Sequence, residues 1–213
     1  MRLLKLSSMG AALLLMVASC GPSTKMVGTW KPETASENLP YKKVFILPMT
    51  ENIRAKAAFE NSVAEQLKRS GVDTELSSTH YPPEFVASSA QDRLNLVAKM
   101  KELGCDAVLV MSLLDSQTET RHVQGNTYPA GAYGYYGGFG TYYGYRYGMV
   151  YDPGYYVEDK IYFLEANVYD VASESLQWSG QSKTYNPSDL ESFSTGYAEI
   201  LVMQLLRNNI IAE

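Results

Sequence analysis

The sequence predicts a single α/β domain (α+β), in which a mixed sheet of about five strands packs against three helices. Two short apolar runs are typical of buried strands, and three segments carry apolar residues at helical spacing. Near the carboxyl end, two segments alternate apolar and polar residues, which is typical of antiparallel strands. The expected element order over residues 42–209 is therefore β-α-β-α-β-β-β-α.

The domain is expected to open with a strand and a helix. Residues 44–47 form a short apolar run, which Pro48 ends, as in a buried strand. In the segment that follows, Phe59, Val63 and Leu67 recur at a spacing of four and define one helical face. Basic residues in the last turn and a glycine after it mark the end of this helix.

A second strand, helix and strand follow. Residues 72–78 predict a strand, and Ser89 with Asp92 predicts the start of a helix over 90–103. The buried face of that helix is expected to carry Leu94, Val97, Met100 and Leu103. Residues 106–116 are apolar on both faces, which favours a central position in the sheet.

The carboxyl-terminal part predicts a hairpin and a last helix. Residues 160–184 read as two antiparallel strands, the first with one face made of Tyr162, Leu164, Ala166 and Val168. Ser188 and Glu191 predict a capping box at the start of the helix.

The amino terminus has the features of an export signal. Arg2 and Lys5 precede an apolar run that ends at Ala18, and this run is shorter than the about 20 residues a membrane-spanning helix needs. The residues Val17-Ala18-Ser19-Cys20 resemble the lipobox of bacterial lipoproteins. The resemblance implies removal of residues 1–19 and attachment of lipid to Cys20, which would hold the protein on a membrane without crossing it.

Other fates of Cys20 remain open at this point. A signal cut elsewhere would leave a free thiol, and a disulfide with Cys105 is a further alternative. The disulfide is disfavoured because Cys105 enters a segment expected to be a buried strand. Two cysteines provide neither a metal cluster nor a disulfide framework, so no metal site is expected.

The net charge of the chain argues against nucleic acid as a partner. Removing Arg2 and Lys5 from the 18 basic residues leaves 16 against 23 acidic ones, a net charge of about −7, which excludes the basic footprint of a nucleic-acid-binding protein.

Residues 20–41 are polar, contain three prolines and are expected to be a lipidated tether. In the lipoproteins that the lipobox resembles, aspartate after the lipidated cysteine favours inner-membrane retention. Gly21 stands there instead, which implies the outer membrane with the body facing the periplasm.

The sequence contains none of the common catalytic motifs searched for, including HExxH, GxSxG and the P-loop lysine. The two histidines, His80 and His122, are each expected to be exposed and structural, since no spacing supplies an ordered base and nucleophile. The adjacent Glu158 and Asp159 would point to opposite faces of a strand, unlike a glycosidase pair. We therefore expect no enzymatic activity and no cofactor.

Residues 128–156 hold 11 of the 17 tyrosines and 8 of the 16 glycines. Within this Tyr/Gly-rich insertion, Tyr143, Tyr145, Tyr147 and Tyr151 fall on alternate positions and would form one aromatic face of a strand. Three uses remain open: a flexible loop, an aromatic surface for a partner, or a membrane-inserting hairpin.

The strand "VFILPM" leading into an alanine-rich helix, and the segment "YDVASESLQWSG", resemble a group of envelope lipoproteins. The group includes the curli secretion lipoprotein CsgG, the amino-terminal domain of TolB and the activator LpoB. The resemblance covers residues 42–209 outside the insertion and implies a binding or assembly module with another envelope protein or a glycan as partner. The alternatives are a subunit of an outer-membrane secretion pore and an unrecognised hydrolase.

The first prediction concerns the anchor. Cys20→Ala should abolish incorporation of an alkyne fatty acid in growing cells, because the thiol that accepts the lipid is lost. The variant should also remain unprocessed or leave the membrane fraction. Labelling equal to that of the unchanged protein would rule out Cys20 as the lipidated residue.

Overall fold

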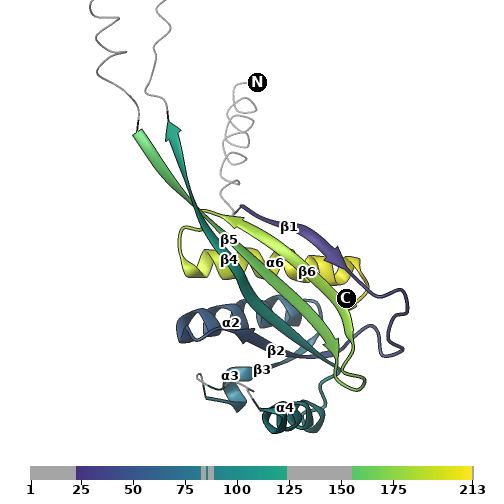
Figure 1. Cartoon of the computed structure of the whole chain (residues 1–213). Coiled ribbons are helices and arrows are strands. Elements are labelled where there is room, and N and C mark those ends of the chain that lie inside the picture. The colour runs from purple at the N-terminus through teal and green to yellow at the C-terminus, as the bar shows by residue number, and fades with distance from the viewer. Residues whose placement is uncertain (1–22, 83–84, 86–88, 124–154, 213) are drawn as a thin grey trace, which may run out of the picture. The chain divides into compact units, whose positions relative to one another are not determined.

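The structure is a computed structural model that describes residues 23–82, 85, 89–123 and 155–212. The elements in chain order are β1 (Ser23–Trp30), β2 (Lys43–Met49), α2 (Ile53–Arg69), β3 (Asp73–Leu76), α3 (Ser77–His80), α4 (Ala90–Glu102), β4 (Ala107–Val123), β5 (Tyr155–Asp170), β6 (Leu176–Tyr185) and α6 (Leu190–Arg207) (Figure 1).

The strands form one mixed sheet in the order β1-β6-β5-β4-β2-β3. β2 runs parallel to both β3 and β4, whereas β1 runs antiparallel to β6. The chain divides into two compact units. Unit 1 comprises residues 1–115 and 162–213, and unit 2 comprises residues 116–161.

The predicted α/β class and element order are confirmed, with two additions. β2, α2, β3, α4, β4, β5, β6 and α6 follow one another as expected, and β4 lies inside the sheet. The additions are the edge strand β1 and the one-turn helix α3. Residues 23–30 were predicted to belong to a tether without regular structure; instead they pair with β6 from Ser23↔Tyr185 to Trp30↔Ser179. The prediction failed because an edge strand with one bonded neighbour needs little apolar periodicity.

The two faces of the sheet in unit 1 are covered differently. In the larger core, α2 and α6 pack on one face against alternate residues of β4, including Ala107, Leu109 and Met111. The side chains between them, Val108 and Val110, face a smaller cluster made with α4. The alternation follows from the two-residue period of a strand, and it confirms the prediction that this strand is apolar on both faces.

The buried faces and the caps of the helices mostly agree with those predicted from the sequence. Phe59, Val63 and Leu67 of α2 are buried as predicted. Four apolar residues of α6, Phe193, Tyr197, Leu201 and Leu205, are also buried. On α4, the capping box of Ser89 and Asp92 is confirmed, but Leu94 is 61 % exposed and does not belong to the buried stripe. The cap of α6 lies one residue later than predicted: Asp189 and Ser192 form the box, because the Asp189 carboxylate accepts from the Ser192 amide at 2.7 Å.

Trp178 of β6 is fully buried beneath α6, and Gly180 makes room for it. A Cβ atom on Gly180 would lie 2.2 Å from the indole Cη2 of Trp178. A side chain at this position would therefore displace the largest residue of the core.

Asp170, at the end of β5, holds the segment before β2 against the sheet. Its fully buried carboxylate accepts hydrogen bonds from the hydroxyls of Ser36 (2.9 Å) and Tyr41 (3.1 Å) and from the Asn38 amide (2.9 Å). The other carboxylate oxygen accepts from the backbone and the hydroxyl of Ser173 in the β5–β6 turn. Burial opposes ionisation, but the hydrogen bonds from Asn38, Ser173 and Ser36 outweigh it and lower the pKa of Asp170.

The second prediction follows from this network. Asp170→Asn should lower the free energy of unfolding at pH 7 by at least about 2 kcal/mol, because the amide turns a donor toward groups that donate to the carboxylate. Since the folded pKa is lowered, the stabilisation is present above the unfolded pKa of about 3.9 and is lost as the pH falls through and below it. Urea titrations between neutral and acidic pH should therefore show the variant and the unchanged protein converging toward acid.

Tyr41→Phe is the matched control, since it removes one donor and keeps the ring. Its cost should be smaller, about 1 to 2 kcal/mol. A loss for Asp170→Asn no greater than that for Tyr41→Phe would contradict the role assigned to the carboxylate.

Candidate functional site

The residues singled out from the sequence as site residues lie outside the described part of the chain. This holds for the lipidation candidate Cys20 and for the aromatic positions Tyr143, Tyr145, Tyr147 and Tyr151. The structure therefore directs attention to surfaces formed by other residues.

Cys105 and His80 both have surroundings typical of residues that stabilise the fold. Cys105 is a buried free cysteine, and burial raises the pKa of its thiol to about 11, so the thiol stays neutral near pH 7. His80 was predicted to be exposed, but its side chain is only 16 % exposed, stacks on Phe45 and lies 3.0 Å from the Glu75 carboxylate. The hydrogen bond from Lys43, with a further one from His80, lowers the pKa of Glu75.

Two further carboxylates accept hydrogen bonds within the fold. Buried Glu60 accepts hydrogen bonds from Ser77 and Ser78 at the start of α3. In unit 2, Asp159 accepts from the Arg121 guanidinium at 3.1 Å, while the adjacent Glu158 is exposed. In the described ranges no cluster of three or more His, Cys, Asp or Glu side chains is arranged to hold a metal ion. Within those same ranges no helix is long and apolar enough to cross a bilayer.

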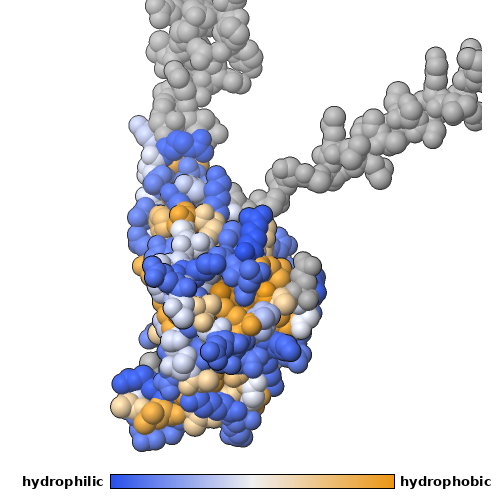
Figure 2. All heavy atoms as spheres, turned by 90° about the vertical axis from the view of Figure 1, so that its right-hand side faces the viewer, coloured by the Kyte–Doolittle hydropathy of each residue, from blue (hydrophilic) through white to orange (hydrophobic). Residues whose placement is uncertain are grey.

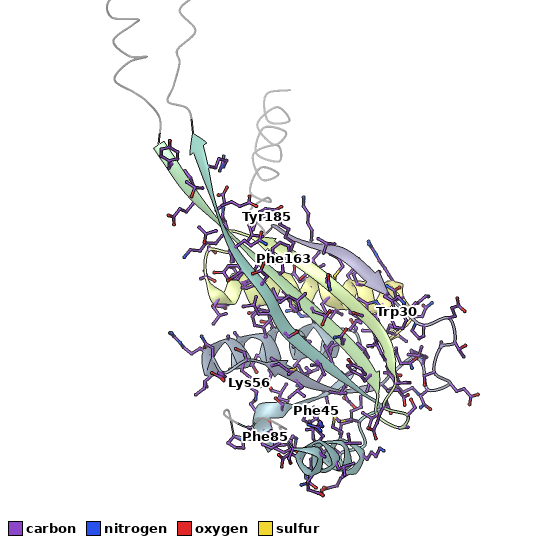
Figure 3. All side chains as sticks on the ribbon, viewed as in Figure 1. Trp30, Phe45, Lys56, Phe85, Phe163 and Tyr185 are labelled. Carbon is purple, nitrogen blue, oxygen red and sulfur yellow. The ribbon has the colours of Figure 1, made fainter. Side chains whose placement is uncertain are left out.

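A polar and aromatic patch lies on the face of the sheet opposite α2 and α6. It consists of alternate residues of two neighbouring strands: Phe163, Glu165 and Asn167 of β5, and Gln181, Lys183 and Tyr185 of β6. In Figure 1 this part of the sheet lies in front of both helices, and Figure 3 shows Phe163 and Tyr185 close together on it.

The side chains of this patch contact one another. The Glu165 carboxylate accepts from Gln181 at 3.2 Å and from Asn167 at 3.1 Å. The Lys183 ammonium lies 5.3 Å from the Phe163 ring centroid and 4.5 Å from that of Tyr185. These are cation–π contacts, which hold the lysine between two rings. The patch is thus a preformed array of amide, carboxylate, ammonium and aromatic groups.

An apolar groove of about 480 Å³ opens at one end of unit 1. It lies where β2 ends and where α2 and α6 begin, beside residues 111–113 in the first half of β4, and the larger side chains that line it include Met49, Phe59, Met111, Leu113, Tyr162 and Phe193. Two polar side chains at the groove already serve as helix caps: Asn52 accepts from the Ala55 amide, and Asp189 from the Ser192 amide. The groove is therefore suited to an apolar group, not to a charged substrate.

The sides of the body also carry exposed hydrophobic residues. Figure 2 shows hydrophobic residues gathered among hydrophilic ones on the side toward β1 and the carboxyl terminus. Val27 and Trp30 of β1 are 56 % and 52 % exposed. Trp30, labelled in Figure 3 at the far end of β1, therefore leaves about half of its surface in contact with solvent.

The sequence offered a signal for one of these surfaces but not for the other. Tyr162, Leu164, Ala166 and Val168 were predicted to face the core, so the residues between them had to face away. The patch could have been found by reading those intervening positions. The groove joins four segments that are distant in sequence, and no local pattern predicts it.

No protein-family model and no curated protein matches the sequence. Among solved structures, the chain is similar to a PelC dodecamer from Paraburkholderia phytofirmans, with 14 % identity, a TM-score of 0.43, and coverage of 90 % of this chain and 99 % of that one. It is similar to the lipoprotein GNA1162 from Neisseria meningitidis, with 13 % identity, a TM-score of 0.41, and coverage of 78 % and 98 %. A PDZ domain protein from Parabacteroides distasonis matches with 9 % identity, a TM-score of 0.42, and coverage of 91 % and 38 %. With identities and TM-scores this low, the comparisons assign the chain to none of these families.

Proposed function

We propose that this protein is a lipid-anchored binding module of the outer membrane that faces the periplasm and is not an enzyme. The observation that carries the proposal is the patch of Phe163, Glu165, Asn167, Gln181, Lys183 and Tyr185. It lies on the face of the sheet opposite α2 and α6, with Gln181 exposed and the other five residues half-buried. Anchoring through Cys20 is supported by the lipobox that ends there and by Gly21 after it.

Binding is favoured over catalysis by the chemistry of the described residues. A neutral, buried thiol at Cys105 is a poor nucleophile. The Glu75 carboxylate lies within ion-pair distance of both His80 and Lys43 at the β2–β3 edge. The groups considered for acid–base or nucleophilic roles thus stabilise the fold instead of converging on a cleft.

The side chains of the patch favour a glycan as the partner. The amides of Asn167 and Gln181 both donate and accept hydrogen bonds, which matches hydroxyl groups that do the same. The rings of Phe163 and Tyr185 add apolar contact area that loses little conformational entropy on binding. The patch has no cluster of large aliphatic side chains, which the buried centre of a protein–protein interface usually contains.

The third prediction tests this surface. The double variant Glu165→Ala, Gln181→Ala should reduce binding of the purified protein to envelope glycans several-fold, because it removes the central acceptor and an exposed amide. Binding can be measured by co-sedimentation with isolated cell-wall sacculi and by gel retardation in secreted polysaccharide.

The matched control is Gln91→Ala, Asn95→Ala, which removes an exposed, hydrogen-bonded amide pair on α4. The control should bind as well as the unchanged protein. Equal loss in both double variants, or no binding of the unchanged protein to either glycan, would overturn the glycan assignment. A protein captured by a photo-crosslinker at Gln181 in intact cells would show instead that the partner is a protein.

A further inference from the structure

The apolar groove and the first residue of β1 lie at the same end of unit 1. β2 ends there at Met49, which lies opposite Ser112, and β4 continues past this level to Val123. At the other side of the sheet, Ser23, the first residue of β1, pairs with Tyr185, the last residue of β6. The chain then passes directly from Tyr185 to Pro187, Asp189 and Leu190, which line the groove.

The anchor must therefore attach near the groove. Cys20 precedes Ser23 by three residues, and an extended chain of that length spans at most about 11 Å. A lipid on Cys20 consequently holds this end of the body, and not the end with the β5–β6 turn, close to the membrane surface.

The rim of the groove is apolar and exposed. Met49 and Ile53 are 62 % and 61 % exposed, and Leu113 is 55 % exposed. These three residues are among the eight large hydrophobic residues found exposed in the described ranges. Exposed apolar groups in one place mark a contact surface, because water solvates them poorly.

The charges at this end indicate which kind of membrane contact is made. In the described part of the chain beside the rim, Glu51, Asp189 and Glu191 are exposed carboxylates and Arg54 is an exposed basic residue, so the charges there do not form a basic cluster that would attract anionic lipids. Contact must come from apolar burial, which is worth about 0.8 kcal/mol per buried CH2. Such a surface adds to an anchor already in place and does not replace it.

We infer that this end of the body rests on the membrane, with Met49, Ile53 and Leu113 in the interface and the groove occupied by an acyl chain of the bilayer. The inference rests on the lipid anchor at Cys20 proposed above. It goes beyond that anchor by giving the body one orientation, with the groove end toward the lipid.

The fourth prediction uses the full-length lipidated protein in vesicles of phosphatidylcholine and phosphatidylethanolamine. A fluorophore is attached at Leu113→Cys or at Ile53→Cys, and nitroxide groups are placed along the lipid acyl chains. Buried Cys105, with its raised pKa, should not react with the label. We expect quenching several-fold stronger at Leu113→Cys and Ile53→Cys than at Leu94→Cys, an equally exposed leucine position on α4.

The possible outcomes distinguish a failure of the proposed anchor from a failure of the proposed orientation. A protein that does not float with the vesicles lacks the lipid, which would contradict the proposed anchor. A protein that floats but shows equal quenching at positions 113, 53 and 94 would overturn the inference while leaving the anchor intact. Strong quenching that is unchanged when anionic lipids are added would support apolar contact over attraction to head groups.

Discussion

The antiparallel pairing of β1 with β6 fixes the position of Ser23, and the proposed orientation depends on it. Its register places Ser23 beside Tyr185, and the Thr24 and Thr184 hydroxyls add a buried hydrogen bond at 2.9 Å. Without this pairing, residues 20–41 would be a tether of considerable reach, and the body could rotate freely beneath its anchor. With it, only two residues, Gly21 and Pro22, lie between Ser23 and the proposed lipid site at Cys20.

Two surfaces of unit 1 then have different chemistry and suit different contacts. The groove is lined by apolar side chains at the end of β2 and in the first half of β4, whereas the patch on β5 and β6 is made of amide, carboxylate, ammonium and aromatic groups. An apolar surface gains free energy by leaving water, whereas the polar groups of the patch need partners that replace their hydrogen bonds to water. A glycan in the periplasm can supply such partners, and a bilayer interior cannot.

The parts of the fold that could be predicted are those in which apolar residues recur at a regular local spacing. Phe59, Val63 and Leu67 identified the buried face of α2, and the alternation from Tyr162 to Val168 identified the core face of β5. β1 was missed because its position depends on hydrogen bonds to β6, more than 150 residues away in the sequence. The burial of His80 was missed for a similar reason, since Phe45 and Glu75 approach it only in the folded chain.

Amide hydrogen exchange of the lipidated chain on vesicles tests the orientation most directly, with the Cys20→Ala chain beside the same vesicles as reference. Helix starts leave their first backbone N–H groups without intrahelical partners, so residues 49–53 and 186–190 can report on membrane contact. The account predicts slower exchange in these two segments of the lipidated chain and unchanged exchange over residues 163–167 and 181–185. Slower exchange over the patch, with no change at residues 49–53 and 186–190, would contradict it.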